Sequence, residues 1–323
     1  MPLIEYVSRR FSSASLALIE TANEIIDSYR QQGYKLTLRQ LYYQFVARDI
    51  IPNKVSEYKR LGSVINDARL AGLIDWTSIE DRTRSLARVS TWSSPANIVG
   101  SAASSYRTDK WAGQPTRVEV WIEKEALAGV FERVCETLEV PYLSCRGYTS
   151  QSEMWGASQR MIATLRTGQN MCVLHFGDHD PSGIDMSRDI QDRLHLFGVN
   201  SQRGEFTFKR IALNMPQIDQ YGPPPNPAKE TDSRFEEYRR THGDESWELD
   251  ALEPSVLSGL VMENVFEFRD LDLWKESHRK QERERHQLSA AAEKWPDLVD
   301  FMHLAHLDSD DDDDDDTDEG DVE

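Results

Sequence analysis

The sequence predicts an α/β protein with more than one domain, and three observations support this fold class. From Arg117 onward, short apolar runs alternate with segments of helical spacing, which is the pattern of a parallel sheet covered by helices. Residues 11–71 show mainly helical spacing, whereas residues 91–116 are rich in Ser, Ala, Thr, Gly and Pro and have little periodicity. The chain of 323 residues is long enough for two domains. We expect a helical domain over 1–95, a linker over 96–116 and an α/β domain with C-terminal helices over 117–306.

The N-terminal domain is predicted to contain a helix-turn-helix. Apolar residues at helical spacing predict helices at residues 11–32, 38–49 and 56–71. Thr37 and Gln40 have the form of a capping box that starts the second helix, and Ser56 is a candidate cap for the third. Trp76–Arg84 would follow these helices as a wing. The expected fold of this domain is a winged (CAP-like) helix-turn-helix.

The second domain alternates strands and helices. Strands are expected at 117–122, 141–145, 170–176 and 207–213, and helices between them at 125–138, 151–167 and 181–196. Tyr221–Pro227 holds four prolines and is expected to be an ordered surface loop. Residues 247–303 are predicted to be largely helical, with Lys275–His286 as a solvated face.

The formal net charge of −19 is concentrated at the C-terminus. Asp308–Glu323 holds twelve acids and no base, so residues 307–323 are expected to be disordered. Two interpretations of this tail remain open: a solubilising end, or a phosphate-like competitor that shields a basic DNA groove. Lys35–Arg88 is locally basic, with ten Lys or Arg against six acids, which favours nucleic acid as a partner.

The cysteines and the absence of targeting signals favour a cytoplasmic protein. Cys135, Cys145 and Cys172 have no paired spacing and are expected to be buried, reduced thiols. The sequence has no apolar signal core and no run of membrane-spanning length, so no membrane association is expected.

Acidic residues follow two predicted strands. Glu123 comes directly after the first strand, and Asp178 and Asp180 follow the strand at 170–176. Ligands of open parallel sheets gather at the carboxyl ends of the strands, and carboxylates with substrate phosphates are the usual ligands of Mg²⁺. Asp180 before Pro181 could instead cap a helix. His179 is expected to support the site or contact phosphate, because imidazole is a poor Mg²⁺ ligand.

Tyr43 is a candidate nucleophile. The predicted helix at 38–49 has an apolar stripe that includes Tyr42, and Tyr43 is turned about 100° away from it. Arg39 lies one turn earlier on the face of Tyr43, where its charge would help the phenol lose its proton. The alternative is that Tyr43 is an ordinary amphipathic surface residue.

Four motifs in order resemble the A subunit of type IIB DNA topoisomerases, the topoisomerase VI family, and its relatives that make meiotic breaks. Arg39–Tyr43 is similar to the family's Arg-Asp-Ile-Tyr-Tyr motif. Val120–Ala126 resembles the Val-Val-Glu-Lys-Glu-Ala strand end of its Toprim domain, and Asp178–Ile184 resembles its Asp-x-Asp-Pro-x-Gly-Ile motif. Arg146–Tyr148 is similar to the Lys-Gly-Tyr/Phe turn between them. The resemblance covers about residues 35–260, and the compact Mini-A proteins look most similar.

The resemblance implies a winged-helix domain, a Toprim domain and a mechanism. Tyr43 would attack duplex DNA and form a 5′-phosphotyrosyl bond, and Arg39 would contact the phosphate. Asp178 and Asp180 would bind Mg²⁺ or Mn²⁺, with Glu123 as a third ligand or as the acid/base at the 3′-oxygen. The family acts as a dimer in which the tyrosine of one protomer faces the metal of the other, so a homodimer with this arrangement is expected. The residues expected to position the DNA backbone are Arg60, Arg69, Arg82 and Arg84.

Departures from the family pattern leave alternatives open. Gln40 replaces the usual Asp, and Ser182 stands where many Toprim proteins carry an acid. No ATPase motif is present, so a separate ATPase partner remains an open question. The alternatives are a Toprim nuclease that uses water, a non-catalytic DNA-binding protein, and a subunit that stays inactive until an ATPase joins it.

Overall fold

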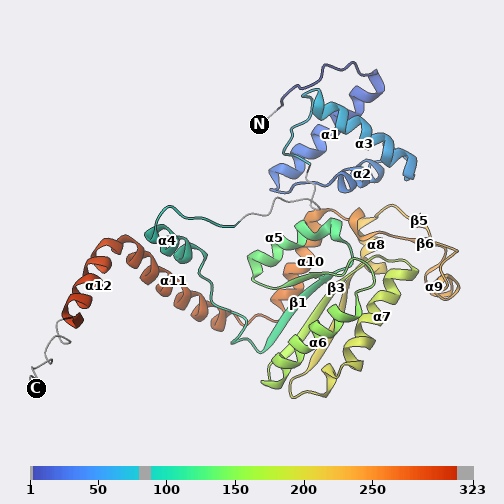
Figure 1. Cartoon of the computed structure of the whole chain (residues 1–323). Helices are drawn as coiled ribbons and strands as arrows, with labels where there is room; N and C mark the ends of the chain where they lie inside the picture. Colours follow the sequence, from blue (N-terminus) through green and yellow to red (C-terminus); the bar gives the residue numbers. More distant parts are fainter. Residues whose placement is uncertain (1–2, 80–88, 311–323) are drawn as a thin grey trace, which may run out of the picture. The chain divides into compact units, whose positions relative to one another are not determined.

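The computed structural model describes residues 3–79 and 89–310, with side chains up to residue 303. Over these residues the chain forms twelve α-helices and a four-stranded parallel sheet (Figure 1), which confirms the α/β class. The chain divides into two compact units. The sheet unit contains the described residues up to 79 together with 114–269, and the helical unit contains 89–113 with 270–310. The N-terminal helices and the sheet therefore share one of these compact units.

Three helices build the N-terminal module of the sheet unit: α1 (Ser13–Gln31), α2 (Leu38–Ala47) and α3 (Val55–Leu70). Their apolar faces share one core. The predicted capping box of α2 is present, with reciprocal hydrogen bonds between Thr37 and Gln40. The predicted cap Ser56 is wrong: the Tyr42 hydroxyl accepts the Lys54 N–H at 2.8 Å, and α3 starts directly after Lys54. Of the predicted wing, residues 80–84 lie outside the described residues.

The sheet has the strand order β2-β1-β3-β4, and all neighbouring strands are parallel. The strands are β1 (Thr116–Ile122), β2 (Tyr142–Ser144), β3 (Asn170–Phe176) and β4 (Phe206–Ala212). The two central strands, β1 and β3, are almost fully buried, as expected for strands covered on both faces. Their last residues, Ile122 and Phe176, are paired, so the segments that follow both strands start at the same sheet edge.

Helices cover both faces of this sheet (Figure 1). The chain passes through α5 (Ala128–Leu138) to β2, then returns over β1 through α6 (Gln151–Arg166) to β3. Because such crossovers are right-handed, α6 and the next helix, α7 (Pro181–Leu196), lie on the face opposite α5. Phe131 of α5 packs edge-on against Phe176, with ring centroids 4.9 Å apart.

The chain after β4 returns to the carboxyl edge of the sheet. Its elements are α8 (Met215–Tyr221), β5 (Asn226–Pro227), α9 (Phe235–His242), β6 (Glu245–Ser246) and α10 (Pro254–Phe266). The predicted loop Tyr221–Pro227 is thus partly regular, because Asn226 and Pro227 pair with β6. Short 3₁₀ helices are η1 (Glu125–Leu127), η2 (Val199–Ser201) and η3 (Leu249–Ala251). Cys135, Cys145 and Cys172 are buried and free, as predicted.

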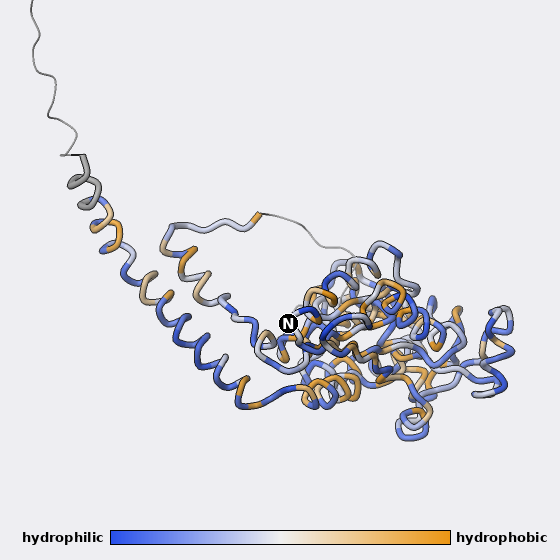
Figure 2. Tube along the Cα trace, turned by 90° about the horizontal axis from the view of Figure 1, so that it is seen from below, coloured by the Kyte–Doolittle hydropathy of each residue, from blue (hydrophilic) through white to orange (hydrophobic). Residues whose placement is uncertain are grey.

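The helical unit contains α4 (Pro95–Ser105), α11 (Leu271–Glu293) and α12 (Trp295–Asp310). The predicted linker thus contains a helix, which Ser94 caps and Pro95 begins. Helix α4 packs on α11, which is hydrophilic over much of its length (Figure 2). Gln281 is the buried exception on α11, and it accepts the backbone N–H of Thr108 at 3.0 Å. Among the residues that the structure describes, no helix combines the length and apolarity needed to cross a membrane.

Candidate active site

Glu123 and Asp178 meet at the carboxyl edge of the sheet. Each follows the end of a central strand, and the register of β1 and β3 brings the two segments together. The backbone N–H of Asp178 donates to Glu123 Oε2 at 2.9 Å. Both carboxylates are buried, at 8% and 6% exposure. The predicted proximity of these two acids is therefore present.

Asp180 caps α7. Its Oδ1 accepts the backbone N–H of Gly183 at 2.6 Å, and Pro181 is the first residue of the helix. Glu123 Oε2 and the carbonyl of Asp178 lie so close to Gly183 that a side chain there would clash. The capping interpretation of Asp180 is thus correct, while its half-buried carboxyl still lies beside Glu123, whose pKa it raises.

A second acidic segment lies against the strand ends. His179 and Trp247 form an antiparallel bridge, with N–H···O distances of 2.8 and 2.9 Å. This bridge aligns Glu248 and Asp250 with the loop after β3. The backbone N–H of Leu249 donates to Asp178 Oδ1 at 2.7 Å. Long-range backbone pairing therefore brings two further acids to the site.

Lys124 links the two acidic segments. Its ammonium lies 2.9 Å from Asp178 Oδ2, 2.6 Å from Glu248 Oε2 and 3.1 Å from Asp250 Oδ1. Asp250 has a side chain with no exposed surface, and Lys124 is only 16% exposed. Burial alone would lower the pKa of Lys124, but the three carboxylates raise it above its usual value. Lys124 is therefore a fixed positive charge at the centre of the site.

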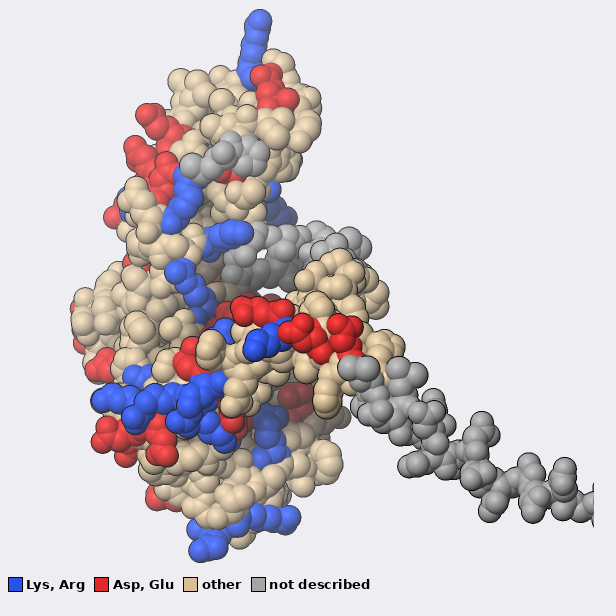
Figure 3. Space-filling view, turned by 90° about the vertical axis from the view of Figure 1, so that its left-hand side faces the viewer, with Lys and Arg blue, Asp and Glu red and all other residues tan. Residues whose placement is uncertain are grey.

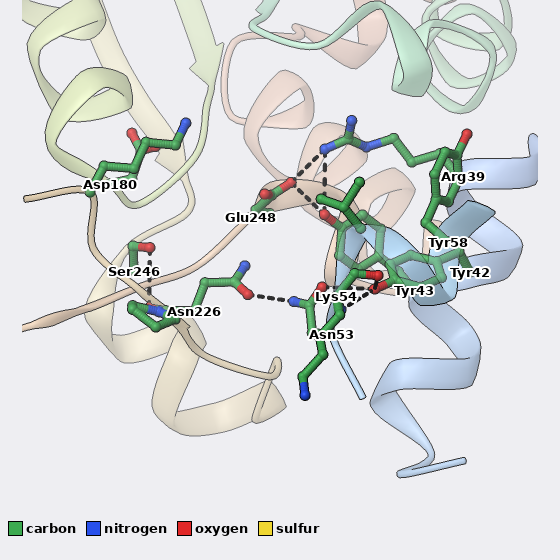
Figure 4. Close-up of a pocket in the computed structure, with 13 residues that line it drawn as sticks. Arg39, Tyr42, Tyr43, Asn53, Lys54, Tyr58, Asp180, Asn226, Ser246 and Glu248 are labelled. Carbon is green, nitrogen blue, oxygen red and sulfur yellow. Dashed lines mark hydrogen bonds and ion pairs between the residues drawn. The ribbon is translucent and has the colours of Figure 1, made fainter. Parts of the chain in front are cut away.

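Arg39 and Tyr43 reach the same acids from α2. Arg39 Nη2 lies 2.9 Å from Glu248 Oε2, and its Nε lies 3.0 Å from Asp250 Oδ2. The Tyr43 hydroxyl donates to Glu248 Oε2 at 2.8 Å (Figure 4). Arg39 and Tyr43 are one helical turn apart, as predicted, with Arg39 Nη2 3.4 Å from the phenolic oxygen. Glu248 thus joins Tyr43 to Lys124 through one carboxylate oxygen.

The expected activation of Tyr43 by Arg39 is not present in this arrangement. Burial raises the pKa of Tyr43, and the carboxylates of Asp250 and Glu248 raise it further, more than Arg39 lowers it. Tyr43 is also 5% exposed, which differs from the alternative of an ordinary surface residue. The phenol keeps its proton for as long as Glu248 accepts its hydrogen bond.

The acids divide into two electrostatic groups. Burial raises the pKa of Asp178 to about 8, and Glu123 and Asp250 add to this effect while Lys124 opposes it. Burial likewise raises the pKa of Glu123. Burial would also raise the pKa of Glu248, but Lys124, Tyr43 and Arg39 lower it to about 2. Burial thus outweighs the nearby cations at the strand-end acids, whereas the cations and the Tyr43 hydrogen bond outweigh burial at Glu248.

This charge imbalance fits a divalent cation, although the predicted ligands are not arranged as a ready-made site. No three His, Cys, Asp or Glu residues of the described chain are grouped so that they could hold a metal ion. Both oxygens of Asp178 accept hydrogen bonds, one from Leu249 and one from Lys124. Mg²⁺ needs only one or two carboxylates when phosphates and waters complete its shell. Glu123 and Asp180 can supply these one or two carboxylates.

Arg210 and His179 form hydrogen bonds that hold the loop after β3 in place. The buried Arg210 guanidinium donates to the carbonyls of Asp178 at 2.6 Å and Gly183 at 3.1 Å. His179 is buried, and its Nδ1 lies 2.9 Å from the Tyr238 hydroxyl. These contacts hold the backbone that carries the acids, in line with the supporting role expected for His179.

Two of the four predicted DNA-positioning arginines lie on α3. Arg60 is exposed and pairs with Glu57 at 2.6 Å. Arg69 donates to the Trp76 carbonyl at 2.8 Å and lies over the Trp76 ring, so its contacts are internal to the N-terminal module. Arg82 and Arg84 lie outside the described residues. On the face drawn in Figure 3, basic side chains form small groups among acidic ones.

Four residues of the site were missed by sequence reasoning: Lys124, Arg210, Glu248 and Asp250. Lys124 lies inside the motif Val120–Ala126, where nothing in the sequence distinguishes a buried lysine from an exposed one. A cation within a predicted strand was the only signal for Arg210. Glu248 and Asp250 offered no such local signal, because they reach the site through the bridge between Trp247 and His179.

A pocket of about 410 Å³ opens beside Tyr43 (Figure 4). One wall comes from α2, α3 and the turn between them, and the other from the β5–β6 region and Asp180. Its lining residues are Arg39, Tyr42, Tyr43, Asn53, Lys54, Val55, Tyr58, Asp180, Asn226, Pro227, Lys229, Ser246 and Glu248. The pocket therefore connects the phenol with the edge of the sheet that carries the acids.

Comparison of the sequence with models of protein families and with curated proteins finds no match to either.

Proposed function

We propose that this chain cleaves and rejoins duplex DNA through Tyr43, by a mechanism like that of the type IIB topoisomerase A subunit. The observation that carries the proposal is the hydrogen-bonded connection from Tyr43 through Glu248 and Lys124 to Asp178. A phenol from the N-terminal helices thus lies in one network with the acids of the sheet in its own chain, whereas the resemblance implies that Tyr43 faces the metal of the other protomer. In this interpretation the helical module is a winged-helix domain, the sheet is a Toprim domain, and the acting species is a homodimer.

The covalent step exchanges one phosphate ester for another. The Tyr43 oxygen attacks the phosphorus, the bond from phosphorus to the 3′-oxygen breaks, and a 5′-phosphotyrosyl bond forms. The phenolic proton passes to Glu248, which already accepts it in a hydrogen bond, and the leaving 3′-oxygen gains a proton to become a hydroxyl. Rejoining is the reverse exchange, so no external energy source is needed for the chemistry.

The phosphate would compete with Glu248 and Asp250 for the cations of the site. Arg39 presents a guanidinium that suits phosphate oxygens, and Lys124 supplies a point charge. When these cations turn to a phosphate, Glu248 loses the charges that hold its pKa near 2, and it becomes a better proton acceptor. DNA binding would in this way activate Tyr43, which resists ionisation in the free chain.

Glu123 and Asp180 would hold Mg²⁺ or Mn²⁺, and Asp178 would join them once Lys124 turns from it to the phosphate. A bound divalent cation would offset the negative charge that builds up on the phosphate during the exchange. Glu123, with its raised pKa, could also supply the proton to the 3′-oxygen.

One observation favours a second candidate function, a metal-dependent nuclease that uses water. Tyr43 is buried and its pKa is raised, so a water molecule could be the better nucleophile at the same acids. Such an enzyme would leave no protein attached to DNA.

The two candidates are separated by one experiment. Supercoiled plasmid is incubated with the protein and Mg²⁺ or Mn²⁺, and the reaction is stopped with detergent, with and without proteinase. Type IIB-like cleavage gives nicked or linear DNA with protein at its 5′ ends. In that case Tyr43→Phe abolishes both the cleavage and the attached protein. If Tyr43→Phe cuts as well as wild type while Asp178→Ala is inactive, the nuclease is the correct function.

A further inference from the structure

The pocket beside Tyr43 has features that the covalent step does not use. We propose that it binds one nucleotide unit, with the base against its aromatic wall and the phosphate between Lys54 and Lys229. The ligand chemistry is that of a nucleoside monophosphate, which could be one residue of a DNA strand or a free nucleotide. The placement next to a reacting phosphate rests on the proposed function, whereas the binding itself does not.

The size and walls of the pocket suit such a ligand. Its volume of about 410 Å³ lies within the usual range of small-molecule sites, which is roughly 300–1,000 Å³. The wall from the N-terminal module contributes three tyrosine rings and Val55, and the opposite wall contributes the polar Asn226 and Ser246. An apolar surface with a few polar groups is the ordinary design of a site for a flat, partly polar ring.

The aromatic wall is held rigidly. Tyr42 packs edge-on against Tyr58, with ring centroids 5.3 Å apart, and against Tyr43 at 5.4 Å. The Tyr42 hydroxyl donates to Asn53 at 3.0 Å and accepts the backbone N–H of Lys54 at 2.8 Å. Because these contacts fix the rings before any ligand arrives, a base can stack there at little entropic cost.

The cations at the rim differ from those of the inner site. Arg39 is already paired with Glu248 and Asp250. Lys54 and Lys229 are exposed, and neither forms an ion pair with a described residue. A phosphate can therefore bind these two ammonium groups without breaking an internal pair. Glu248 and Asp180 are the acids of the lining, and each has a partner of its own, Lys124 and the N-terminus of α7 respectively.

The rim also carries groups that can read a base edge. The side-chain amide of Asn53 donates to that of Asn226, which connects the α2–α3 turn to β5 (Figure 4). Amide side chains can both donate to and accept from a base. Since Tyr43 lines the same pocket, a nucleotide bound here would hold the adjoining phosphate of its strand near the phenolic oxygen.

The test measures binding in the Tyr43→Phe protein, which cannot form a covalent bond to DNA. A short, labelled single-stranded oligonucleotide is titrated by fluorescence anisotropy, and deoxynucleoside monophosphates, deoxyribose 5-phosphate and inorganic phosphate compete with it. We expect Lys54→Gln and Lys229→Gln to weaken binding by about three- to tenfold each and to lower the salt dependence. Tyr58→Leu should weaken it roughly tenfold through loss of stacking.

Lys59→Gln is the matched control, because Lys59 is an exposed lysine of α3 that does not line the pocket. It should stay within about twofold of the parent protein. Circular dichroism and the melting temperature check that Tyr58→Leu remains folded, and the two lysine variants test the proposal if it does not. Equal binding of mononucleotide and oligonucleotide identifies a free nucleotide as the ligand, and tighter oligonucleotide binding identifies a strand.

Two results would overturn the proposal: unchanged affinity in Lys54→Gln and Lys229→Gln, or competition by inorganic phosphate as strong as that by mononucleotides. A different result would show that the proposed function is wrong while the binding proposal holds. In that case wild type forms no covalent complex with DNA, while the pattern of binding defects in the pocket variants persists.

Discussion

The hydroxyl of Tyr43 is hydrogen-bonded to the carboxylate of Glu248, which lies 205 positions later in the chain. The same carboxylate oxygen receives Arg39 and Lys124. One oxygen atom therefore connects the phenol with both cations. The charge of the site depends on that oxygen. Loss of its negative charge should change the pKa of Tyr43.

Glu248→Gln should lower the pKa of Tyr43. The variant keeps a hydrogen-bond acceptor but loses a charge that, with burial and Asp250, raises the pKa of this phenol. Ultraviolet difference titration measures the effect, with Tyr43→Phe subtracting the signal of the other tyrosines. Coincident titrations of Tyr43 in wild type and variant would show that the charge of Glu248 does not control this phenol.

Asp178→Asn should stabilise the metal-free protein near neutral pH. The folded-state pKa of Asp178 is about 8, against an ordinary value of 3.8. At this group the folded state thus binds more protons than the unfolded state between these values, so the contribution of Asp178 to stability falls as pH rises from about 4 to 8. The variant lacks this penalty and keeps an acceptor for the Leu249 N–H.

Melting temperatures in a chelator, recorded across that pH range, provide the measurement for Asp178→Asn. The gap between variant and wild type should widen as pH rises. A lower melting temperature of the variant at every pH would mean that the charge of Asp178 on Lys124 stabilises the fold more than its burial destabilises it.

Asp250→Ala should destabilise the protein strongly. Asp250 has no exposed side-chain surface, and it pairs with Arg39 at 3.0 Å and with Lys124 at 3.1 Å. Removing one partner from a buried ion pair costs about 3–5 kcal/mol, and the half-exposed Arg39 places this site toward the lower end. Urea unfolding measures the loss. Glu245→Ala, an exposed acid of β6, is the control and should change stability by less than about 0.5 kcal/mol.

Mg²⁺ or Mn²⁺ should raise the melting temperature of wild type. A ligand that binds only the folded state at a concentration of about 100 times its Kd stabilises it by roughly 2.7 kcal/mol. Glu123→Gln and Asp180→Asn should reduce this shift, since both remove a carboxylate next to the buried Asp178. A shift of the same size in both variants would place the cation elsewhere. The readout does not depend on DNA cleavage.

Local signals in the sequence predicted much of the sheet edge. The capping box at Thr37 placed α2, and the positions of Glu123 and Asp178 after neighbouring strands placed them together. Both inferences depend on residues close in sequence or on a general rule for parallel sheets. They needed no knowledge of which distant segments pair.

The missing half of the site depends on such a distant pairing. Glu248 and Asp250 reach the strand ends because Trp247 bridges His179, and nothing local to either segment specifies this partner. The proton affinity of Tyr43 was misjudged for the same reason, since two carboxylates that outweigh Arg39 come from that segment. The helix α4 was missed because its Ser- and Ala-rich sequence becomes helical against α11, far along the chain.

The pairing of α4 with α11 has a consequence for any shortened form of this protein. Arg285 of α11 donates to the carbonyls of Ala103 and Ser104, and Trp274 packs on Trp111. A chain that stops at Arg269 would strip these partners from a segment in its middle, between the N-terminal helices and β1. Trimming the C-terminus would thus loosen an internal connection, and the resulting fragment should be more open to proteases near residues 95–111 than at its new end.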